Sequence, residues 1–392
     1  MTVLSYIVLA VAAIPGIYYL LVLYSSARFF WSSKQAPANS DFTPPVSCLK
    51  PIRGLDPDAY ENYASFCRQD YPEYEILFCV DRTDPALKVI EQVVRDFPQC
   101  KVRVLFGSGR IAANDKVAKL ARLSGEAQYE YLVINDSDVR VNPEHFRTMV
   151  GPLADPKVGA VTSFYVPTEE KSLAQHLQSV GMLSDFYAGI LVAWELDGVK
   201  FALGPNIATT RSRLAGFGGY QAIENRPADD LLVGRLIAEQ GSEVRLLSYS
   251  VLAVADYHSM RDLFNKRLRW IVVMRNMRPW GHLGLIFTLG LPWALAAVVM
   301  RPTPVMAFAY FGTYLLLRCA MTWLIGSWGL KRPVSWQKYA LIPVWDAMAS
   351  LIWLVSFTRK TFMWRGQKYF TRQGQLVPAA DDAASQLSEE KG

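Results

Sequence analysis

The stretches EILFCV (75–80) and YLVIN (131–135) decide the fold of this chain, because each is a short apolar run of β-strand length. Two further strand-like runs lie on either side of the first stretch, at 46–50 and 102–106. Segments with apolar residues at helical spacing separate these runs, at 59–69, 87–97 and 116–123. Alternating strands and helices predict an α/β domain with parallel strands and helices on its faces.

Polar residues directly after these strands are candidate site residues, because such sheets bind ligands at the carboxyl ends of their strands. Asp81 and Asp84 follow the first stretch, and Asp136, Ser137 and Asp138 follow the second. An Asp-x-Asp pair supplies oxygen ligands for Mg²⁺ or Mn²⁺, which would neutralise a departing diphosphate. Turns are also rich in aspartate, but two acidic strand ends favour a site. We expect Asp136 and Asp138 to hold the metal, and Asp81, Asp84 and Asp136 to contact a nucleotide donor.

A second acidic pair, Asp229-Asp230, opens the helical segment LLVGRLIAEQG (231–241). One aspartate at such a place would act as an N-cap. Two adjacent carboxylates exceed what capping requires, so the other interpretation is a general base that deprotonates an acceptor hydroxyl. The two interpretations are compatible, since they can apply to different aspartates.

Three other residues are candidates for contact with the donor. Lys50 and Pro51 open KPIRG (50–54), whose backbone would approach a nucleotide base, with Gly54 permitting a tight turn. Lys116 in ANDK (113–116) would reach a phosphate, or it is an ordinary solvated lysine of a helix. The sequence leaves both interpretations of Lys116 open.

The segment DLFNKRLRWIVVMRNMRPW (262–280) combines apolar residues at helical spacing with a crowd of basic residues. This pattern predicts an amphipathic helix on a membrane surface, with Trp270 and Trp280 at the headgroups. It leaves room for a second role, in which Arg269 faces the diphosphate and Trp270 lines the acceptor site.

Four apolar stretches predict membrane helices. The first, at 3–24, has the length of a span and is followed by Arg28 and Lys34, so the positive-inside rule places the next segment in the cytosol. A cleaved signal peptide is disfavoured because no basic residue precedes the stretch. The other three stretches lie at 283–300, 304–328 and 339–357.

Four simple spans would leave the basic residues after 358 outside the cell. We therefore expect one of the last three stretches to be re-entrant or interfacial, because Arg359, Lys360, Arg365 and Lys368 favour the cytosol. Asp346 marks the last stretch as one candidate, since a carboxylate inside a membrane is costly unless it faces protein or water.

Composition narrows the class of protein. Of the 392 residues 51% are hydrophobic and 19% charged, which fits a membrane protein. The net charge of +6 comes without a long basic and aromatic surface, so we expect no nucleic-acid partner. Five cysteines without a CxxC pair and four scattered histidines argue against a disulfide framework or a zinc site, and favour a reducing compartment.

Together these motifs resemble the ceramide glucosyltransferases, a branch of the inverting GT-A glycosyltransferases. The resemblance lies in LKPIRG (49–54), ENYASFCRQDYPEYEILFCVDRTDP (61–85), NDSDVRV (135–141), ADDLLVGRLIAEQG (228–241) and RLRW (267–270), within about 46–279. It implies a Rossmann-like mixed sheet with flanking helices as the catalytic domain, plus transmembrane or interfacial helices. It also implies a UDP-sugar donor, a divalent metal, a ceramide-like lipid acceptor and inversion at the anomeric carbon.

The resemblance also implies roles for single residues. Asp81 looks like the family aspartate at the uridine, and Asp136 and Asp138 like the metal and diphosphate site. Lys116 matches a lysine beside the nucleotide, and Asp230 looks like the catalytic base. Arg269 and Trp270 look like the last two residues of a QxxRW-type signature.

The chain departs from the family pattern at three places. Lys266 stands where the signature has Gln or Arg, and we expect it to contact the donor without the fork geometry of arginine. Arg267 next to it would compensate. A histidine of the animal enzymes has no counterpart in LSDFYAGI (183–190), and Asp138 replaces a glycine common in those enzymes.

The expected layout follows the chain. We predict a transmembrane anchor at 1–26, a linker at 27–45, a cytosolic catalytic domain at 46–262 and an interfacial helix at 263–280. Transmembrane or re-entrant helices at 281–358 and a basic, then polar tail at 359–392 complete it. The expected location is the bacterial inner membrane.

The alternatives differ in acceptor or in class. The acceptor would instead be a hopanoid, a diacylglycerol or a polyprenyl phosphate. A polysaccharide synthase would need more spans, and a transporter would not devote most of its length to α/β sequence. A non-catalytic membrane scaffold with a nucleotide-binding fold would be expected to have lost its acidic motifs, which are intact here.

Overall fold

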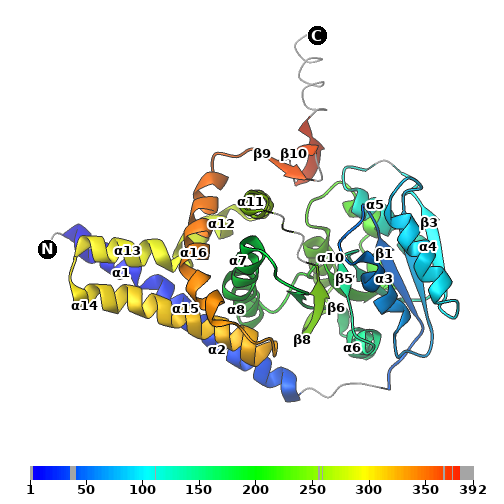
Figure 1. Cartoon of the computed structure of the whole chain (residues 1–392), viewed down its shortest axis with the longest axis horizontal. Helices are drawn as coiled ribbons and strands as arrows, with labels where there is room; N and C mark the ends of the chain where they lie inside the picture. The colour runs from blue at the N-terminus through cyan, green and yellow to red at the C-terminus, as the bar shows by residue number, and fades with distance from the viewer. Residues whose placement is uncertain are drawn as a thin grey trace, which may run out of the picture. The chain divides into compact units, whose positions relative to one another are not determined.

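A computed structural model describes residues 3–35, 41–110, 112–254, 257, 259–364, 367–372 and 374–379 (Figure 1). The predictions for residues 1–2, part of the linker (36–40), His258, Arg365 and the end of the tail (380–392) therefore lie outside the described residues. The chain separates into two compact units. The sheet unit comprises Gln35–Glu169 and Asp197–Asp256, and the helical unit comprises Met1–Lys34, Glu170–Leu196 and Tyr257–Gly392.

The sheet unit is built on an eight-stranded mixed sheet with the strand order β3-β2-β1-β4-β7-β6-β8-β5. Its parallel half consists of β1 (Val46–Pro51), β2 (Tyr74–Val80), β3 (Val102–Phe106) and β4 (Tyr131–Asn135). The other strands are β5 (Val139–Arg140), β6 (Val158–Pro167), β7 (Asn206–Thr210) and β8 (Glu243–Ala253). Strand β7 runs antiparallel to both β4 and β6.

Helices follow the strands of the parallel half, as the alternating pattern predicts. These are α3 (Ala59–Cys67), α4 (Ala86–Asp96) and α5 (Asp115–Glu126), and all four predicted strands are confirmed. Helix α6 (His145–Val150), a 3₁₀ turn at Gly151–Ala154, α9 (Arg211–Ala215), a 3₁₀ turn at Tyr220–Ile223 and α10 (Asp229–Glu239) complete the sheet unit. The core between sheet and helices is apolar, with Phe66, Phe78, Val133 and Phe146 fully buried.

Helix α10 approaches the backbone of residues 201–202 too closely for a side chain at Gly234. A Cβ atom built there lies 2.3 Å from the Ala202 nitrogen and from the Phe201 carbonyl carbon, and backbone cannot swing aside. We expect Gly234→Ala to lower the free energy of unfolding by ~1–3 kcal/mol through overpacking. Gly125→Ala in α5, where no atom lies within 4 Å of the new Cβ, should be neutral or slightly stabilising. Thermal unfolding of both variants tests this, and an unchanged Gly234→Ala protein would contradict it.

Among the described residues, the helical unit contains three helices that are long and apolar enough to cross a membrane: Ser5–Ser33, Pro304–Gly329 and Trp336–Ser356. The first span joins α1 (Val3–Ala12) to α2 (Ile14–Gln35). The second runs through α14 (Pro304–Met306), a π-helical turn at Ala307–Gly312, α15 (Thr313–Trp323) and a second π-helical turn at Leu324–Gly329. The third is α16 (Trp336–Ser356).

The first of the three C-terminal apolar stretches is bent. Its two halves, Pro279–Phe287 and Gly290–Met300, bend by 46° at the break, as a broken span or re-entrant loop does. The hydroxyl of Tyr19 bridges this break, because it donates to the Thr288 carbonyl at 2.9 Å and accepts from the Gly290 amide at 2.8 Å. The halves comprise α12 (Pro279–Gly284), a 3₁₀ turn at Leu285–Phe287, and α13 (Gly290–Met300).

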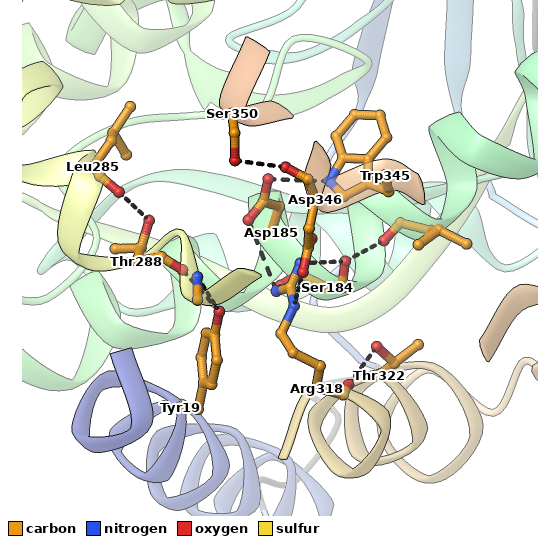
Figure 2. A network of polar contacts seen from close by, with 12 residues as sticks. Tyr19, Ser184, Asp185, Leu285, Thr288, Arg318, Thr322, Trp345, Asp346 and Ser350 are labelled. Atoms are coloured by element: carbon orange, nitrogen blue, oxygen red, sulfur yellow. Dashed lines mark hydrogen bonds and ion pairs between the residues drawn. The ribbon is translucent and has the colours of Figure 1, made fainter. Parts of the chain in front are cut away.

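Asp346 is accommodated in a complete helix because Arg318 of α15 pairs with it. Both side chains are buried, and the Arg318 Nε atom donates to Asp346 Oδ2 at 2.9 Å (Figure 2). The hydroxyl of Tyr314 donates to the same oxygen at 2.7 Å. The carboxylate thus faces protein, which is the condition under which a charge is tolerated at membrane depth.

The rest of the helical unit comes from two parts of the chain. The segment Glu170–Leu196 supplies α7 (Leu173–Gly181), a π-helical turn at Met182–Phe186, and most of α8 (Tyr187–Asp197). The amphipathic segment forms α11 (Met260–Met277). Beyond the last span the structure shows a three-stranded antiparallel sheet that the sequence did not predict, with β9 (Thr361–Trp364), β10 (Gln367–Arg372) and β11 (Gln375–Pro378).

Candidate active site

Lys116 lies at the centre of an acidic cluster at the ends of the strands of the sheet unit. Its ammonium contacts Asp136 Oδ1 at 2.7 Å and Asp229 Oδ2 at 3.1 Å, and only 14% of its side chain is exposed. Burial alone would lower the pKa of Lys116, but Asp136, Asp229 and Asp230 outweigh it and raise that pKa. Of its two interpretations, the solvated lysine is wrong, because this side chain joins the strand-end motif to the second acidic pair.

Asp230 is held by the backbone and has an altered pKa. Its Oδ2 atom accepts a hydrogen bond from the Gly204 amide at 2.8 Å. Burial, and then the neighbouring charge of Asp229, raise its pKa from 3.8 to about 6. A carboxylate with a pKa near the working pH suits a general base.

Neither aspartate of the pair is the N-cap of α10, so the capping interpretation is wrong. The N-cap is Ala228, which has a positive φ of 54° and makes no side-chain cap. Such a backbone conformation is rare for alanine and strained. It starts the helix directly at Asp229, which puts both carboxylates in the first turn, where the helix dipole favours negative charge.

Loop contacts hold the starts of α5 and α10 together. Asn114, the N-cap of α5, donates from its amide to the Arg226 carbonyl at 3.1 Å, and its own N–H donates to the Glu224 carbonyl. The Ala113 amide donates to the Asn225 side chain at 2.9 Å. These bonds link the loop before Lys116 to the loop before Asp229, so the two charges meet at fixed positions.

Asp81 contacts a second lysine that the sequence analysis missed. Lys119 is 1% exposed, and its ammonium contacts Asp81 Oδ2 at 3.0 Å, Asp115 Oδ2 at 3.2 Å and the Ile52 carbonyl at 2.9 Å. About half of the Asp81 side chain remains exposed, which leaves it accessible to a ligand. The i, i+3 spacing of Lys116 and Lys119 was the available signal, because it puts both on one face of the helix.

Asp138 and Asp56 lie close to Asp136. Burial, followed by the charges of Asp136 and Asp56, raises the pKa of Asp138 to about 7. The hydroxyl of Ser137 donates to Asp56, which lies on the loop after β1 and was not expected at the site. Crowded carboxylates of this kind fit a divalent cation, whose charge would favour their ionised forms.

A metal at this place would complete its coordination with other ligands. Within the described ranges no group of three His, Cys, Asp or Glu residues is arranged to hold an ion by itself. Mg²⁺ is commonly bound through one or two carboxylates plus substrate phosphates. The donor set of Asp136 and Asp138 therefore fits a metal that arrives with, or is completed by, a diphosphate.

Lys50 holds the backbone at the end of β4 through a hydrogen bond to Asp136. Its side chain is fully buried, donates to the Asp136 carbonyl at 2.6 Å and lies over the Phe66 ring. Burial lowers its pKa to about 8. Pro51 ends the same buried strand. A direct contact of either residue with a nucleotide stays a prediction, and the structure adds a positioning role for Lys50.

Asp84 accepts hydrogen bonds from the backbone of the loop after β1 and from the start of α4. Its oxygens accept from the Gly54 amide at 2.7 Å and from the Ala86 amide at 2.9 Å. These bonds fix the KPIRG turn, in which Gly54 has a φ of 77°. The contact of Asp84 with the donor remains a prediction.

The residues of the RLRW signature lie on α11 in the helical unit. Arg269 lies over the ring of Trp364, and Trp270 packs on Phe186 with ring centroids 5.8 Å apart. Lys266 pairs with Asp262 at 3.0 Å. Arg267 is 8% exposed, and its Nε atom donates to Gln178 at 2.8 Å. Because Arg267 points into its own unit, the idea that it compensates for Lys266 receives no support.

The contact between Gly204 and Asp230 yields a sharp prediction. A Cβ atom at position 204 would lie 2.9 Å from Asp230 Oδ2, so the carboxylate must turn away. We expect Gly204→Ala to lower kcat roughly 10- to 100-fold, because small misplacements of reacting groups have effects of that size. The melting temperature should change little. Gly189→Ala, with open space around the new Cβ, is the matched control for kinetics and melting, and equal turnover of both variants would contradict the prediction.

The fold and the site define a class, the glycosyltransferases with a GT-A fold. The structure resembles a solved mannosyltransferase from Pyrobaculum calidifontis in complex with GDP-Man and Mn²⁺, with a TM-score of 0.57. That match covers 88% of this chain and 99% of the other at 18% identity, so it shows the fold alone.

The family follows from sequence comparison. The model of glycosyltransferase family 21 matches residues 7–377, so the chain belongs to that family and is a glycosyltransferase. Ceramide glucosyltransferase 1 of Caenorhabditis elegans is 22% identical over 348 residues, or 83% of this chain and 71% of the relative. A ceramide glucosyltransferase of Komagataella phaffii is 36% identical over 101 residues, or 24% of this chain and 20% of the relative.

Proposed function

We propose that this enzyme transfers glucose from UDP-glucose to the primary hydroxyl of ceramide, with inversion at the anomeric carbon. The observation that carries the proposal is the position of Lys116, which joins the Asp-x-Asp motif at Asp136 to the Asp229-Asp230 pair. The residues proposed to bind the donor and to accept the proton therefore belong to one cluster. The activity in the names of the matched relatives supports glucose and ceramide.

The proposed reaction is a direct displacement. Asp230 takes the proton of the lipid hydroxyl, whose oxygen attacks the anomeric carbon as the bond to the nucleotide diphosphate breaks. Asp81 binds the uridine. Asp136 and Asp138 would hold a divalent metal, which supplies positive charge to the diphosphate. Lys116 places a further positive charge between donor and base, and Arg269 is the proposed cation for the leaving group.

The pKa of Asp230 predicts the pH dependence of this reaction. The base must be ionised, and its raised pKa of about 6 means that it becomes protonated as the pH falls through 6. We expect kcat/KM to fall about tenfold per pH unit below pH 6 and to level off above it. A pH profile at saturating metal measures this, and activity that stayed constant down to pH 4.5 would contradict the role of Asp230.

The spans suggest the orientation in the membrane. With three spans and a re-entrant bent pair, the segment after the first span and the residues after the third lie on one side. Arg359 and Lys360, which follow the third span, support a cytosolic location for that side, because the positive-inside rule favours basic residues there. We propose a cytosolic active site at the bacterial inner membrane.

A transfer assay in detergent tests the function. UDP-glucose, UDP-galactose, UDP-N-acetylglucosamine and GDP-mannose are crossed with ceramide, a hopanoid, a diacylglycerol and a polyprenyl phosphate, and products are identified by mass spectrometry. We expect hexosylceramide from UDP-glucose. Transfer to another lipid alone would overturn the acceptor, and no transfer with any pair would favour a non-catalytic scaffold.

A further inference from the structure

The helical unit contains a π-helical turn, Met182–Phe186, between α7 and α8. Its Ser184 is buried and donates to the Val180 carbonyl at 2.8 Å. A π turn is a rare, wide form of helix that is often found at functional sites. Two residues follow Ser184 in this turn. Asp185 is itself able to accept a further hydrogen bond, and Phe186 packs on Trp270, which contacts Arg267.

A buried ion pair holds this turn in place. Arg318 donates to the Ser184 carbonyl and hydroxyl as well as to Asp346 (Figure 2). Apolar residues of the same shape often stabilise a fold as well as a buried ion pair does. The specific benefit of the pair here is geometric, because it fixes the backbone at Ser184 and therefore the direction of Asp185.

Asp185 is an oriented acceptor with capacity to spare. Its Oδ2 atom accepts from the indole N–H of Trp345 at 3.1 Å, and its Oδ1 atom lies 3.8 Å from the Arg318 guanidinium (Figure 2). About a third of its side chain is exposed. An ionised carboxylate has about four acceptor positions, so it remains able to accept from a ligand.

Arg267 provides the complementary donor. Its guanidinium lies between the rings of Trp270 and Trp345, 4.8 Å from each centroid, and its side chain is more than nine-tenths buried. Its Nη2 atom is buried and has no hydrogen-bond partner among the described residues. A buried donor without a partner is unfavourable, so this atom has the capacity to bind an acceptor oxygen that the described residues do not supply.

The acceptor and the donor share one aromatic neighbour. Trp345 donates to Asp185 and stacks on Arg267, while Phe186 packs on Trp270. The unit therefore presents one hydrogen-bond acceptor and one donor against aromatic rings. This combination suits an apolar molecule with a small polar head. That head would contain both a carbonyl and an N–H or O–H group.

We propose that Arg267 and Asp185 bind the amide and hydroxyl head of the acceptor lipid. The amide carbonyl accepts from Arg267 Nη2, and the amide N–H or a second hydroxyl donates to Asp185. A diacylglycerol lacks a second donor, and a polyprenyl phosphate would bring a negative charge to Asp185. The inference rests on the proposed function and names the groups that would select an amide lipid.

Steady-state kinetics with a short-chain ceramide and UDP-glucose test this proposal. We expect Asp185→Leu to raise the KM for the ceramide about 10- to 100-fold, the effect of losing a hydrogen bond to a charged group. The KM for UDP-glucose and kcat at saturating ceramide should change less than about threefold. Asp185→Asn, which keeps an acceptor oxygen, should restore part of the affinity, and Arg267→Lys should raise the same KM.

Two controls separate binding from folding. Asp197→Asn replaces an exposed carboxylate at the end of α8, and Arg261→Met replaces an exposed arginine at the start of α11. Both should leave the KM for ceramide unchanged. An unchanged ceramide KM in the Asp185 variants, or an equal loss in both KM values and kcat, would overturn the inference while wild-type transfer to ceramide upholds the proposed function. Wild-type transfer only to lipids without an amide would overturn both.

Discussion

Replacing Asp230 by asparagine should lower kcat by about 10³-fold or more, because the reaction loses the group that accepts the hydroxyl proton. The side chain keeps its size, so the Gly204 amide still finds an oxygen to donate to. Binding of UDP should stay within about threefold of wild type, since the donor is held by other residues. Radiolabelled sugar transfer and UDP titration calorimetry measure the two quantities.

The controls for this prediction use the same helix and the same protein preparation. Glu239→Gln removes an exposed carboxylate of α10 that pairs with Arg235, and it should keep wild-type turnover. The melting temperature of Asp230→Asn at pH 7 should equal or exceed that of wild type. The raised pKa of Asp230 means that its charge destabilises the folded protein, and the neutral amide removes that charge. Wild-type turnover by Asp230→Asn would remove this residue from the mechanism.

The second large effect is expected from Lys116→Met. Without the ammonium, Asp136 and Asp229 lose their ion-pair partner, and Asp230 loses a nearby cation that lowers its pKa. We expect kcat/KM to fall about 10²- to 10³-fold, an effect of the size seen when one charge-stabilising group is removed. The acidic limb of the pH profile should also move to higher pH, because Lys116 lowers the pKa of Asp230.

That pH shift distinguishes an electrostatic role from a structural one. Lys116→Arg keeps the charge and should recover part of the activity and the wild-type position of the acidic limb. Lys88→Met, at an exposed position of α4, should behave as wild type. Loss of activity in Lys116→Met with an unmoved pH profile would show that the lysine does not set the charge state of Asp230.

The parallel half of the sheet was predictable because its signals are local. Runs such as YLVIN (131–135) are buried strands whatever surrounds them, and the helices between them show their own spacing. The same locality made Asp136 and Asp138 recognisable, since both follow a strand directly. The second half of the sheet was harder to predict from sequence. Strand β7 pairs with β4, but the segment Glu170–Leu196, which belongs to the other unit, lies between the two strands in the sequence.

Contacts between distant segments explain what the sequence did not predict. Asp56 reaches the site through Ser137, 81 positions further along the chain, and Lys119 reaches Asp81 across 38 positions. The inward direction of Arg267 depends on Gln178 and Trp345, which come from two other helices. Asp346 made the last apolar stretch a candidate for a re-entrant helix, because an unpaired carboxylate is costly in a membrane. Its partner Arg318 lies on a different helix, and local sequence does not reveal this pairing.

An experimental structure of the enzyme with Mn²⁺ and a non-transferable UDP-glucose analogue tests directly whether the donor binds beside the proposed base. We expect uracil density at Asp81, the metal and diphosphate at Asp136 and Asp138, and the glucose ring within reach of Asp230. Density for the nucleotide at a surface away from these four aspartates would contradict it.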